Sequence, residues 1–275
     1  MTGVQTCALP ILIPAYIISL ANQQDRREHM RQECARVGIE ATFIDAVDMR
    51  QASQSDIECL SSRLLHKKTK KQRWLTRGEL GCALSHHQVY AHIVRQQHPY
   101  ALILEDDAEF IRNPQPLLNE GYLNNITEQY PFDVLLLGYV KTLKHQLPYY
   151  YRRIPIKTRA KLQINSDSIL FGTPWEQYGS GAVAYVVTQT GAQRLLNVTR
   201  KPSAVADDWL YFEQHHGLRI LHSRPAFVLE ALEKLDSTIR QEKAGFLQPK
   251  TSSVIIRSIK GYLKHIGMNY LGMKS

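Results

Sequence analysis

The hydrophobic positions of the chain form short apolar runs that alternate with amphipathic stretches. Ala15–Leu20 and Ala41–Val47 are rich in β-branched and aromatic residues, which is typical of buried strands. The polar stretch between them predicts a helix that ends near Gly38, and Asn22 with Asp25 predicts a capping box at its start. This β-α-β order predicts parallel strands joined by a right-handed crossover.

The same alternation continues to the C-terminus. We expect a helix over Glu79–Gln97, broken by Pro99, and the polar, tyrosine-rich segment Lys141–Phe171 fits either a hairpin or a loop. The remaining apolar and amphipathic runs predict strands at Tyr100–Leu104, Phe132–Gly138, Gly179–Val187, Leu218–His222 and Ala226–Glu230, and helices at Thr190–Asn197 and Asp207–His216. The pattern indicates an α/β fold with a mainly parallel central sheet flanked by helices.

Composition allows one large domain, since the chain has 275 residues of which 44% are hydrophobic. The formal net charge of +9 is concentrated in two segments. Residues 63–77 hold seven Lys or Arg and no acid, residues 251–275 hold four and no acid, and the remainder therefore sums to 9 − 11 = −2. Basic patches of this kind suit the phosphates of a membrane, a glycolipid or a nucleic acid.

The C-terminal segment combines its charges with apolar residues at helical spacing. The apolar positions are Ile255, Ile259, Tyr262, Ile266, Tyr270 and Met273, and the basic ones are Arg257, Lys260, Lys264 and Lys274. This pattern predicts an amphipathic helix at a membrane interface, although three glycines disfavour a helix, and the alternative is a helix packed on the core. No apolar run reaches the roughly 18–20 residues of a membrane-spanning helix.

The N-terminus and the cysteines add little chemistry. Cys7–Ala21 is apolar, but it has no preceding basic residue and contains Pro10 and Pro14, which argues against a secretory signal. We expect Met1–Ile11 to be an extraneous segment, residues 12–248 to form the main domain, and residues 249–275 to form the basic tail. The four cysteines, Cys7, Cys34, Cys59 and Cys82, show neither C-x-x-C pairing nor zinc-ligand spacing with histidine, so we expect free thiols in a reducing compartment.

The acidic run Glu105-Asp106-Asp107 is the main candidate for chemistry. It follows the apolar strand Tyr100–Leu104, and ligands of open α/β sheets bind beyond the carboxyl ends of the strands. Adjacent carboxylates repel one another, and a hard divalent cation such as Mn²⁺ or Mg²⁺ relieves the repulsion while also binding phosphate oxygens. The run therefore predicts a metal–diphosphate site, and the alternative is a solvated acidic turn.

Two further groups of polar residues are candidates. Thr76 and Glu79 form a capping-box pattern, followed by Ser85 and His86, where His86 either touches a ligand or packs in the core. Asp207-Asp208 offers a carboxylate that could deprotonate an acceptor hydroxyl, and the alternative for this pair is helix capping.

These residues lie in a series of segments that resembles glycosyltransferase family 25. In order along the chain, the similar segments are Tyr16-Ile-Ile-Ser-Leu-Ala with Asp25-Arg26-Arg27, Phe43-Ile-Asp-Ala46, Gly78-Glu-Leu-Gly-Cys-Ala-Leu-Ser-His86, Pro99-Tyr-Ala-Leu-Ile-Leu-Glu-Asp-Asp107, Tyr178-Gly-Ser180, Ala184-Tyr185, Asp207-Asp208 and Asp236-Ser-Thr-Ile239. Each segment alone is weak, whereas the ordered set is specific and covers most of the chain.

The resemblance implies a GT-A-type nucleotide-diphospho-sugar transferase fold and an inverting, metal-dependent transfer of a sugar, commonly galactose, from a UDP-sugar to lipooligosaccharide, LPS or another glycan. It implies metal binding by Glu105, Asp106 and Asp107, and catalysis by Asp207 or Asp208, between which the sequence does not choose. Donor contacts are expected at Ser19, Leu20, Arg26, Asp45, Ala46, Glu79, Ser85, His86, Glu105, Gly179 and Ser180. The segment from Gly179 to Tyr185 is slightly longer than the family spacing.

With the basic tail, the resemblance predicts a cytoplasmic protein held peripherally at the inner membrane of a Gram-negative bacterium, with a glycolipid or oligosaccharide acceptor and no nucleic-acid partner. Two other classes remain as alternatives. One is a non-catalytic module that binds nucleic acid or anionic lipid through its basic patches, although Arg63–Arg77 offers only Trp74 as a base-stacking aromatic. The other is a different metal-dependent phosphoryl-transfer enzyme or hydrolase.

Overall fold

A computed structural model describes residues 12–65, 72–175, 181–232 and 251–272. Several sequence features lie outside these ranges. They are the extraneous segment Met1–Ile11, residues 66–71 of the basic segment, the donor contacts Gly179 and Ser180, the segment Asp236-Ser-Thr-Ile239 and the domain boundary at residue 248.

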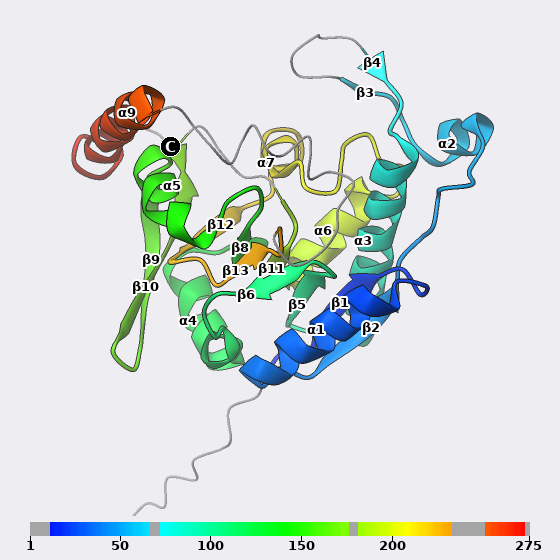
Figure 1. The fold of residues 1–275 in the computed structure, drawn as a ribbon, viewed down its shortest axis with the longest axis horizontal. Helices are drawn as coiled ribbons and strands as arrows, with labels where there is room; N and C mark the ends of the chain where they lie inside the picture. Colours follow the sequence, from blue (N-terminus) through cyan, green and yellow to red (C-terminus); the bar gives the residue numbers. More distant parts are fainter. Residues whose placement is uncertain (1–11, 66–71, 176–180, 233–250, 273–275) are drawn as a thin grey trace, which may run out of the picture.

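The centre of the fold is an eight-stranded sheet of order β2-β1-β5-β11-β7-β12-β10-β9 (Figure 1). Its strands are β1 (Ala15–Ser19), β2 (Ala41–Asp45), β5 (Tyr100–Glu105), β7 (Val134–Leu136), β9 (Ile156–Ile164), β10 (Asp167–Pro174), β11 (Ala184–Thr188) and β12 (Ile220–Arg224). The pairings β1–β2, β1–β5 and β7–β12 are parallel, and β11 and β10 are antiparallel to both of their neighbours. All strands except β11 and β10 thus point the same way, but four of the seven pairings are antiparallel, so the sheet is mixed. The predicted α/β fold with a central sheet flanked by helices is confirmed.

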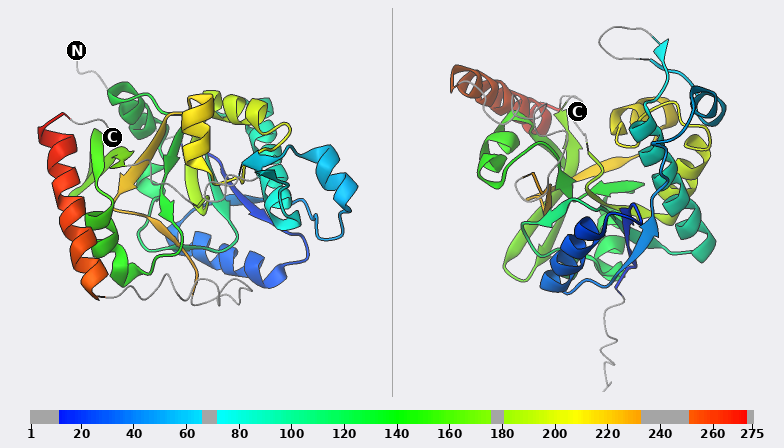
Figure 2. Two further views of the ribbon diagram at one scale, coloured as in Figure 1. Left: turned by 90° about the horizontal axis from the view of Figure 1, so that it is seen from above. Right: turned by 45° about the vertical axis from the view of Figure 1, so that its right-hand side comes forward.

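Helices cover both faces of this sheet because alternate residues of its strands point to opposite sides. Ile17 of β1 packs in the core under α1 (Gln24–Val37) and α4 (Glu120–Gln129). Its neighbours Tyr16 and Ile18 pack in the second core, under α3 (Arg77–Gln96), α6 (Gln189–Val198) and α7 (Trp209–His216). The two helical layers lie on either side of the sheet in Figure 2.

The helix ends follow the sequence in part. Gly38 ends α1 in the left-handed conformation with φ of 71°, as predicted, because glycine has no Cβ to oppose it. The capping box predicted from Asn22 and Asp25 is wrong, since the N-cap is Gln23 and no side chain caps the helix. By contrast, the capping box of Thr76 and Glu79 at the start of α3 is confirmed.

Smaller elements surround the sheet. A three-stranded sheet joins β6 (Ala108–Phe110), β13 (Val228–Glu230) and β8 (Gly138–Tyr139), and its register pairs Glu230 with Ala108. The chain also forms α2 (Gln54–Leu60), the hairpin of β3 (Leu64–Leu65) and β4 (Gln72–Arg73), and short 3-10 helices at Gln115–Leu117 and Lys144–Gln146. The small sheet brings the C-terminal strand β13 beside the acidic turn.

The unassigned segment Lys141–Phe171 contains α5 (Leu147–Arg153) and the first part of the β9–β10 hairpin. The tail forms α9 (Thr251–Tyr270), which packs against α5 and β9 (Figure 1). A Cβ at Gly261 would lie 1.7 Å from the carbonyl oxygen of Arg152, so this glycine is needed for the contact. The stripe of Ile255, Ile259 and Tyr262 is instead exposed, at 56%, 57% and 65%. Within the described residues, no helix is both long and apolar enough to cross a membrane.

Candidate active site

The carboxyl ends of β1, β2 and β5 meet at one edge of the sheet. Ser19 pairs with Asp45, and Ile18 pairs with Glu105, so these three strand ends lie side by side. The backbone N–H of Ala46 donates to the carbonyl oxygen of Ser19 at 2.9 Å, and Arg27 donates to the same oxygen at 2.9 Å while pairing with Asp45. The structure therefore brings together the strand-end residues that were predicted to contact the donor.

Arg26 of α1 faces the acidic turn. Glu105 ends β5, and Asp106 and Asp107 form the turn to β6. The Nε atom of Arg26 lies 2.8 Å from Oδ1 of Asp106, and its Nη2 atom lies 2.9 Å from Oδ2 of Asp107. One guanidinium thus pairs with both aspartates of the predicted metal motif.

Two more carboxylates from distant parts of the sequence approach this turn. Asp207 accepts a hydrogen bond from the backbone N–H of Gly181 at 3.0 Å, while the indole of Trp209 donates to the carbonyl oxygen of Gly181 at 2.9 Å. Glu230, at the end of β13, accepts from the backbone N–H of Lys141 at 3.2 Å. The result is an acidic cluster, which we define as Glu105, Asp106, Asp107, Asp207 and Glu230.

The charges of this cluster perturb one another. Removal from water, followed by the charges of Asp207, Asp106 and Glu230, raises the pKa of Glu105 to about 8, against the opposing effect of Arg26. Removal from water and the charge of Glu105 raise the pKa of Asp107 to about 7, again opposed by Arg26. The guanidinium of Arg26 therefore does not offset these shifts, and a bound cation would stabilise the ionised form of the carboxyls.

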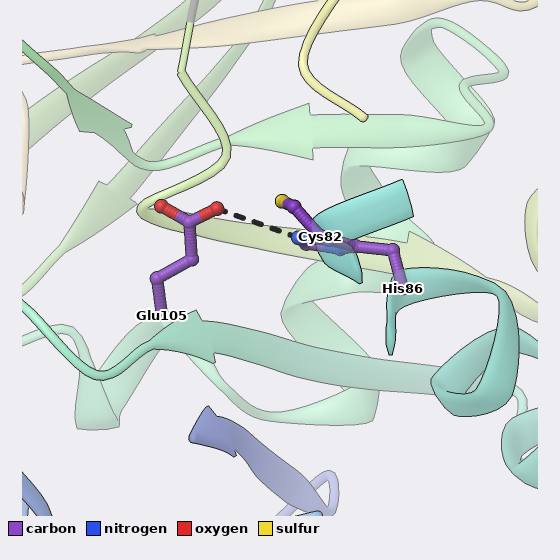
Figure 3. Close-up of side chains that lie close together, drawn as sticks. All are labelled: Cys82, His86 and Glu105. Atoms are coloured by element: carbon purple, nitrogen blue, oxygen red, sulfur yellow. Dashed lines mark hydrogen bonds and ion pairs between the residues drawn. The ribbon is translucent and has the colours of Figure 1, made fainter. Parts of the chain in front are cut away.

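His86 extends the site onto α3. Its ring is 1% exposed, its Nδ1 atom lies 2.7 Å from the hydroxyl of Tyr185, and that hydroxyl lies 2.8 Å from the hydroxyl of Tyr90. Burial lowers the pKa of His86 to about 4, so the ring is neutral at pH 7. Its Nε2 atom lies 3.4 Å from Oε1 of Glu105 (Figure 3).

Cys82, one turn before His86 on α3, points toward the same place. The ligand atoms of Cys82, His86 and Glu105 all lie within 4.8 Å of one another, and no other group of three such residues is found in the described parts of the chain. Two sequence inferences change as a result. Cys82 does stand at metal-ligand spacing from a histidine, so that prediction was wrong. The oxygens of Glu105, Asp106 and Asp107 do not form such a group by themselves, because the two aspartates face Arg26.

Other predicted site residues have structural partners. Glu79 caps α3 and binds Arg73 through two contacts of 2.7 Å. Ser85 accepts from the backbone N–H of Val47 at 2.8 Å and donates to Gly81, which ties α3 to the segment after β2. Asp208 is the N-cap of α7 and accepts from the N–H of Tyr211 at 3.1 Å. Of the two candidate bases, Asp207 is the one whose charge acts on Glu105.

Sequence inference missed Glu230, Cys82 and the Tyr90–Tyr185 pair as parts of the site. Glu230 lies at the end of a predicted strand, as Glu105 does, and this position could have indicated that it belongs to the site. Cys82 and His86 stand four residues apart on a predicted helix, which places them on one face. Tyr90 continues that face one turn further.

With this geometry in place, comparison with known proteins assigns the chain to a family. A family model described as "Glycosyltransferase family 25 (LPS biosynthesis protein)" matches residues 12–210. The chain belongs to glycosyltransferase family 25, as its sequence motifs predicted.

Curated relatives match about two thirds of the chain. It is 28% identical over 186 residues to "Probable inactive glycosyltransferase 25 family member 3" of Bos taurus, and 26% identical over 183 residues to "Procollagen galactosyltransferase 2" of Homo sapiens. Each alignment covers 66% of this chain but only 28% and 27% of those proteins, so the chain spans little more than a quarter of their length. A solved glycosyltransferase involved in glycosylation of the major capsid of PBCV-1 covers 85% of this chain and 97% of its own, with a TM-score of 0.38 and 10% identity.

Proposed function

We propose that this protein is an inverting, metal-dependent glycosyltransferase that transfers a sugar, most simply galactose, from a UDP-sugar to lipooligosaccharide, LPS or a related glycan. The acidic cluster beside the strand ends of β1 and β2 carries the proposal, because ligands of open α/β sheets bind beyond the carboxyl ends of the strands and a divalent cation would offset the clustered negative charge. Two names support the sugar and the acceptor class. The family is described by LPS biosynthesis, and a human relative is named a galactosyltransferase.

The cluster offers the ligand type of a hard divalent cation, and its side chains would have to converge on the ion, since no three of its described carboxylates offer oxygens that all lie within 4.8 Å of one another. Its ligands are carboxylate oxygens, which Mn²⁺ and Mg²⁺ prefer. The Oδ1 atom of Asp107 is buried and accepts no hydrogen bond from the described residues, so it is available as a ligand. When bound, the ion would neutralise charge on the departing diphosphate. Arg26, already beside Asp106 and Asp107, is placed to pair with a phosphate of the same donor.

The base that inversion requires is assigned to Asp207. The acceptor hydroxyl must lose a proton as its oxygen attacks the anomeric carbon, and a positioned carboxylate can take that proton. The hydrogen bond from Gly181 to Oδ2 positions the Asp207 carboxylate through one of its two oxygens, and we assign the other oxygen to the acceptor. Asp208 instead serves the start of α7.

A lipid-linked acceptor would place the enzyme at a membrane, and we assign α9 to that contact. Its exposed apolar face, Ile255, Ile259 and Tyr262, points away from α5 and β9, and Arg257 and Lys260 are exposed on the same helix. This pairing suits an anionic bilayer surface of the kind at the cytoplasmic face of an inner membrane, where each basic residue contributes about 1 kcal/mol. Of the other basic segment, residues 66–71 lie outside the described ranges, and Arg73 pairs with Glu79.

A donor screen tests the proposal. Purified protein is incubated with a panel of UDP-sugars and glycan acceptors, with Mn²⁺ and with the metal chelated, and UDP release and glycosylated product are measured. We expect release with UDP-galactose that stops on chelation and returns with added Mn²⁺. Salt-sensitive DNA binding without UDP release would support a binding module instead. Phosphate release from monoesters would support another metal-dependent enzyme.

A further inference from the structure

The chain contains a second kind of metal-ligand set beside the carboxylates. Cys82 and His86 lie on one face of α3, and Glu105 approaches them from the end of β5 (Figure 3). This trio offers one sulfur, one nitrogen and one oxygen ligand, whereas the acidic cluster offers oxygens alone. We propose that Cys82, His86 and Glu105 form a binding site for a borderline-soft divalent ion of the Zn²⁺ class.

Two distances agree with this site. Zinc binds nitrogen and oxygen at about 2.0–2.2 Å and sulfur at about 2.3 Å, so tetrahedral neighbours lie roughly 3.3–3.6 Å apart. The Nε2 atom of His86 and the Oε1 atom of Glu105 are 3.4 Å apart. This distance is longer than a good hydrogen bond and falls within the separation expected for two ligands of one zinc ion. The sulfur of Cys82 lies within 4.8 Å of a ligand atom of both residues. A small movement of this exposed side chain would bring the sulfur to ligand distance.

The surroundings of His86 orient it as a ligand. When Nε2 binds a metal, Nδ1 carries the proton and needs an acceptor, and such an outer partner is typical of metal-binding histidines. The hydroxyl of Tyr185 lies 2.7 Å from Nδ1, where it can accept this hydrogen bond, and it can donate its own hydrogen bond to the hydroxyl oxygen of Tyr90 at 2.8 Å. The ring is also fixed by its neighbour, since it stacks on Tyr185 with ring centroids 5.8 Å apart.

The trio also leaves a position open. Three protein ligands and one free position are typical of a zinc site that binds water or substrate, whereas structural zinc sites have four protein ligands. The Cys82 residue is exposed. The thiolate and imidazole select zinc-class ions over Mg²⁺ and Mn²⁺, which prefer oxygen. The site shares Glu105 with the acidic cluster, whereas Cys82 and His86 belong to this site alone, so their variants test it separately from the proposed glycosyl transfer.

Metal binding without any nucleotide tests this inference. Co²⁺ is titrated into the full chain under reducing conditions, and the thiolate-to-cobalt charge-transfer absorption is recorded, followed by its displacement with Zn²⁺. We expect the band in the wild type and in the matched control Cys59→Ser, which removes another exposed thiol. We expect Cys82→Ser to abolish the band and to weaken Zn²⁺ binding by at least about tenfold, since even outer partners contribute 10–100-fold.

A second variant tests whether the hydroxyl that orients His86 contributes to Zn²⁺ affinity. Tyr185→Phe keeps the ring and removes the hydroxyl that orients His86, so we expect Zn²⁺ affinity to fall about 10–100-fold while the charge-transfer band remains at saturating Co²⁺. Circular dichroism checks that each variant is folded. Equal Zn²⁺ affinity in the wild type and Cys82→Ser, or a band that follows Cys59, would overturn the site. Neither result depends on UDP-sugar turnover.

Discussion

Asp207 accepts a hydrogen bond at 3.0 Å from the backbone N–H of Gly181, and this contact holds its carboxylate beside the acidic cluster. The adjacent residue Asp208 has a different task, since its side chain caps α7. Two neighbouring acids that the sequence could not distinguish are therefore separated by the structure.

This difference predicts opposite outcomes for matched variants. Asp207→Asn keeps the shape but removes the base, so we expect sugar transfer to fall by about 10²–10⁴-fold. Asp208→Asn should retain transfer within a few-fold, because asparagine is as good an N-cap as aspartate. Product formation from UDP-galactose and a glycan acceptor measures both. Equal losses in the two variants would contradict the assignment of the base.

Metal affinity should rise with pH. Glu105 and Asp107 have pKa values raised to about 8 and about 7, so both are largely protonated at pH 6 in the absence of a cation. Binding of Mn²⁺ then requires release of these protons, and affinity falls as pH falls through those values. We expect the Mn²⁺ Kd to be at least about tenfold larger at pH 6 than at pH 8, by calorimetry in buffers of different ionisation enthalpy. A Kd that does not change with pH, with no proton release, would show that these carboxyls do not bind the metal.

A variant of Glu79 tests whether this residue has a structural role or contacts the donor. Its side chain completes a capping box and binds Arg73 at the start of α3. Glu79→Gln keeps the capping box, since glutamine serves there too, and loses the ion pair. We expect a loss of stability of about 0–1 kcal/mol and an unchanged KM for the donor, measured by denaturant unfolding and steady-state kinetics. A large rise in KM without loss of stability would restore the donor role predicted from the sequence.

The exposed face of α9 gives a membrane prediction. Ile259→Ser removes an apolar side chain that is 57% exposed, so folding stability should change little, while binding to anionic vesicles should weaken by about tenfold. Leu60→Ser, at a 41% exposed apolar position on α2, serves as the matched control and should bind as the wild type does. Sedimentation with phosphatidylglycerol-rich vesicles measures the effect. Equal sedimentation of the Ile259 variant would exclude this face as the contact.

The strand and helix order was largely predictable because local patterns determine it. The apolar runs of β1 and β5 and the amphipathic face of α3 appear directly in the sequence. The direction of β11 could not be predicted, because its antiparallel pairing with β5 depends on long-range contacts and not on its short apolar run. The sequence does not distinguish a hairpin from a loop at β9–β10, because these strands mix apolar and charged residues.

The site was predictable only where its residues are neighbours in the chain. Glu105, Asp106 and Asp107 are consecutive and follow a recognisable strand. Glu230 lies beside them because β13 pairs with β6, and no local sequence pattern predicts that pairing. The tail shows the reverse case. Its glycines have low helix propensity, yet Gly261 allows α9 to pack closely against α5, because a Cβ there would clash with the backbone of Arg152.

The most direct test of the central claim is the rate of Mn²⁺-dependent UDP release from UDP-galactose by Asp107→Asn. The neutral amide removes a negative ligand without changing shape, and Glu128→Gln, an exposed carboxylate on α4, is the matched control. We expect release to fall by at least about 10²-fold in Asp107→Asn, because transition-state charge stabilisation is lost, and to be unchanged in Glu128→Gln. Full release by folded Asp107→Asn, or wild-type release that persists with the metal chelated, would contradict this claim.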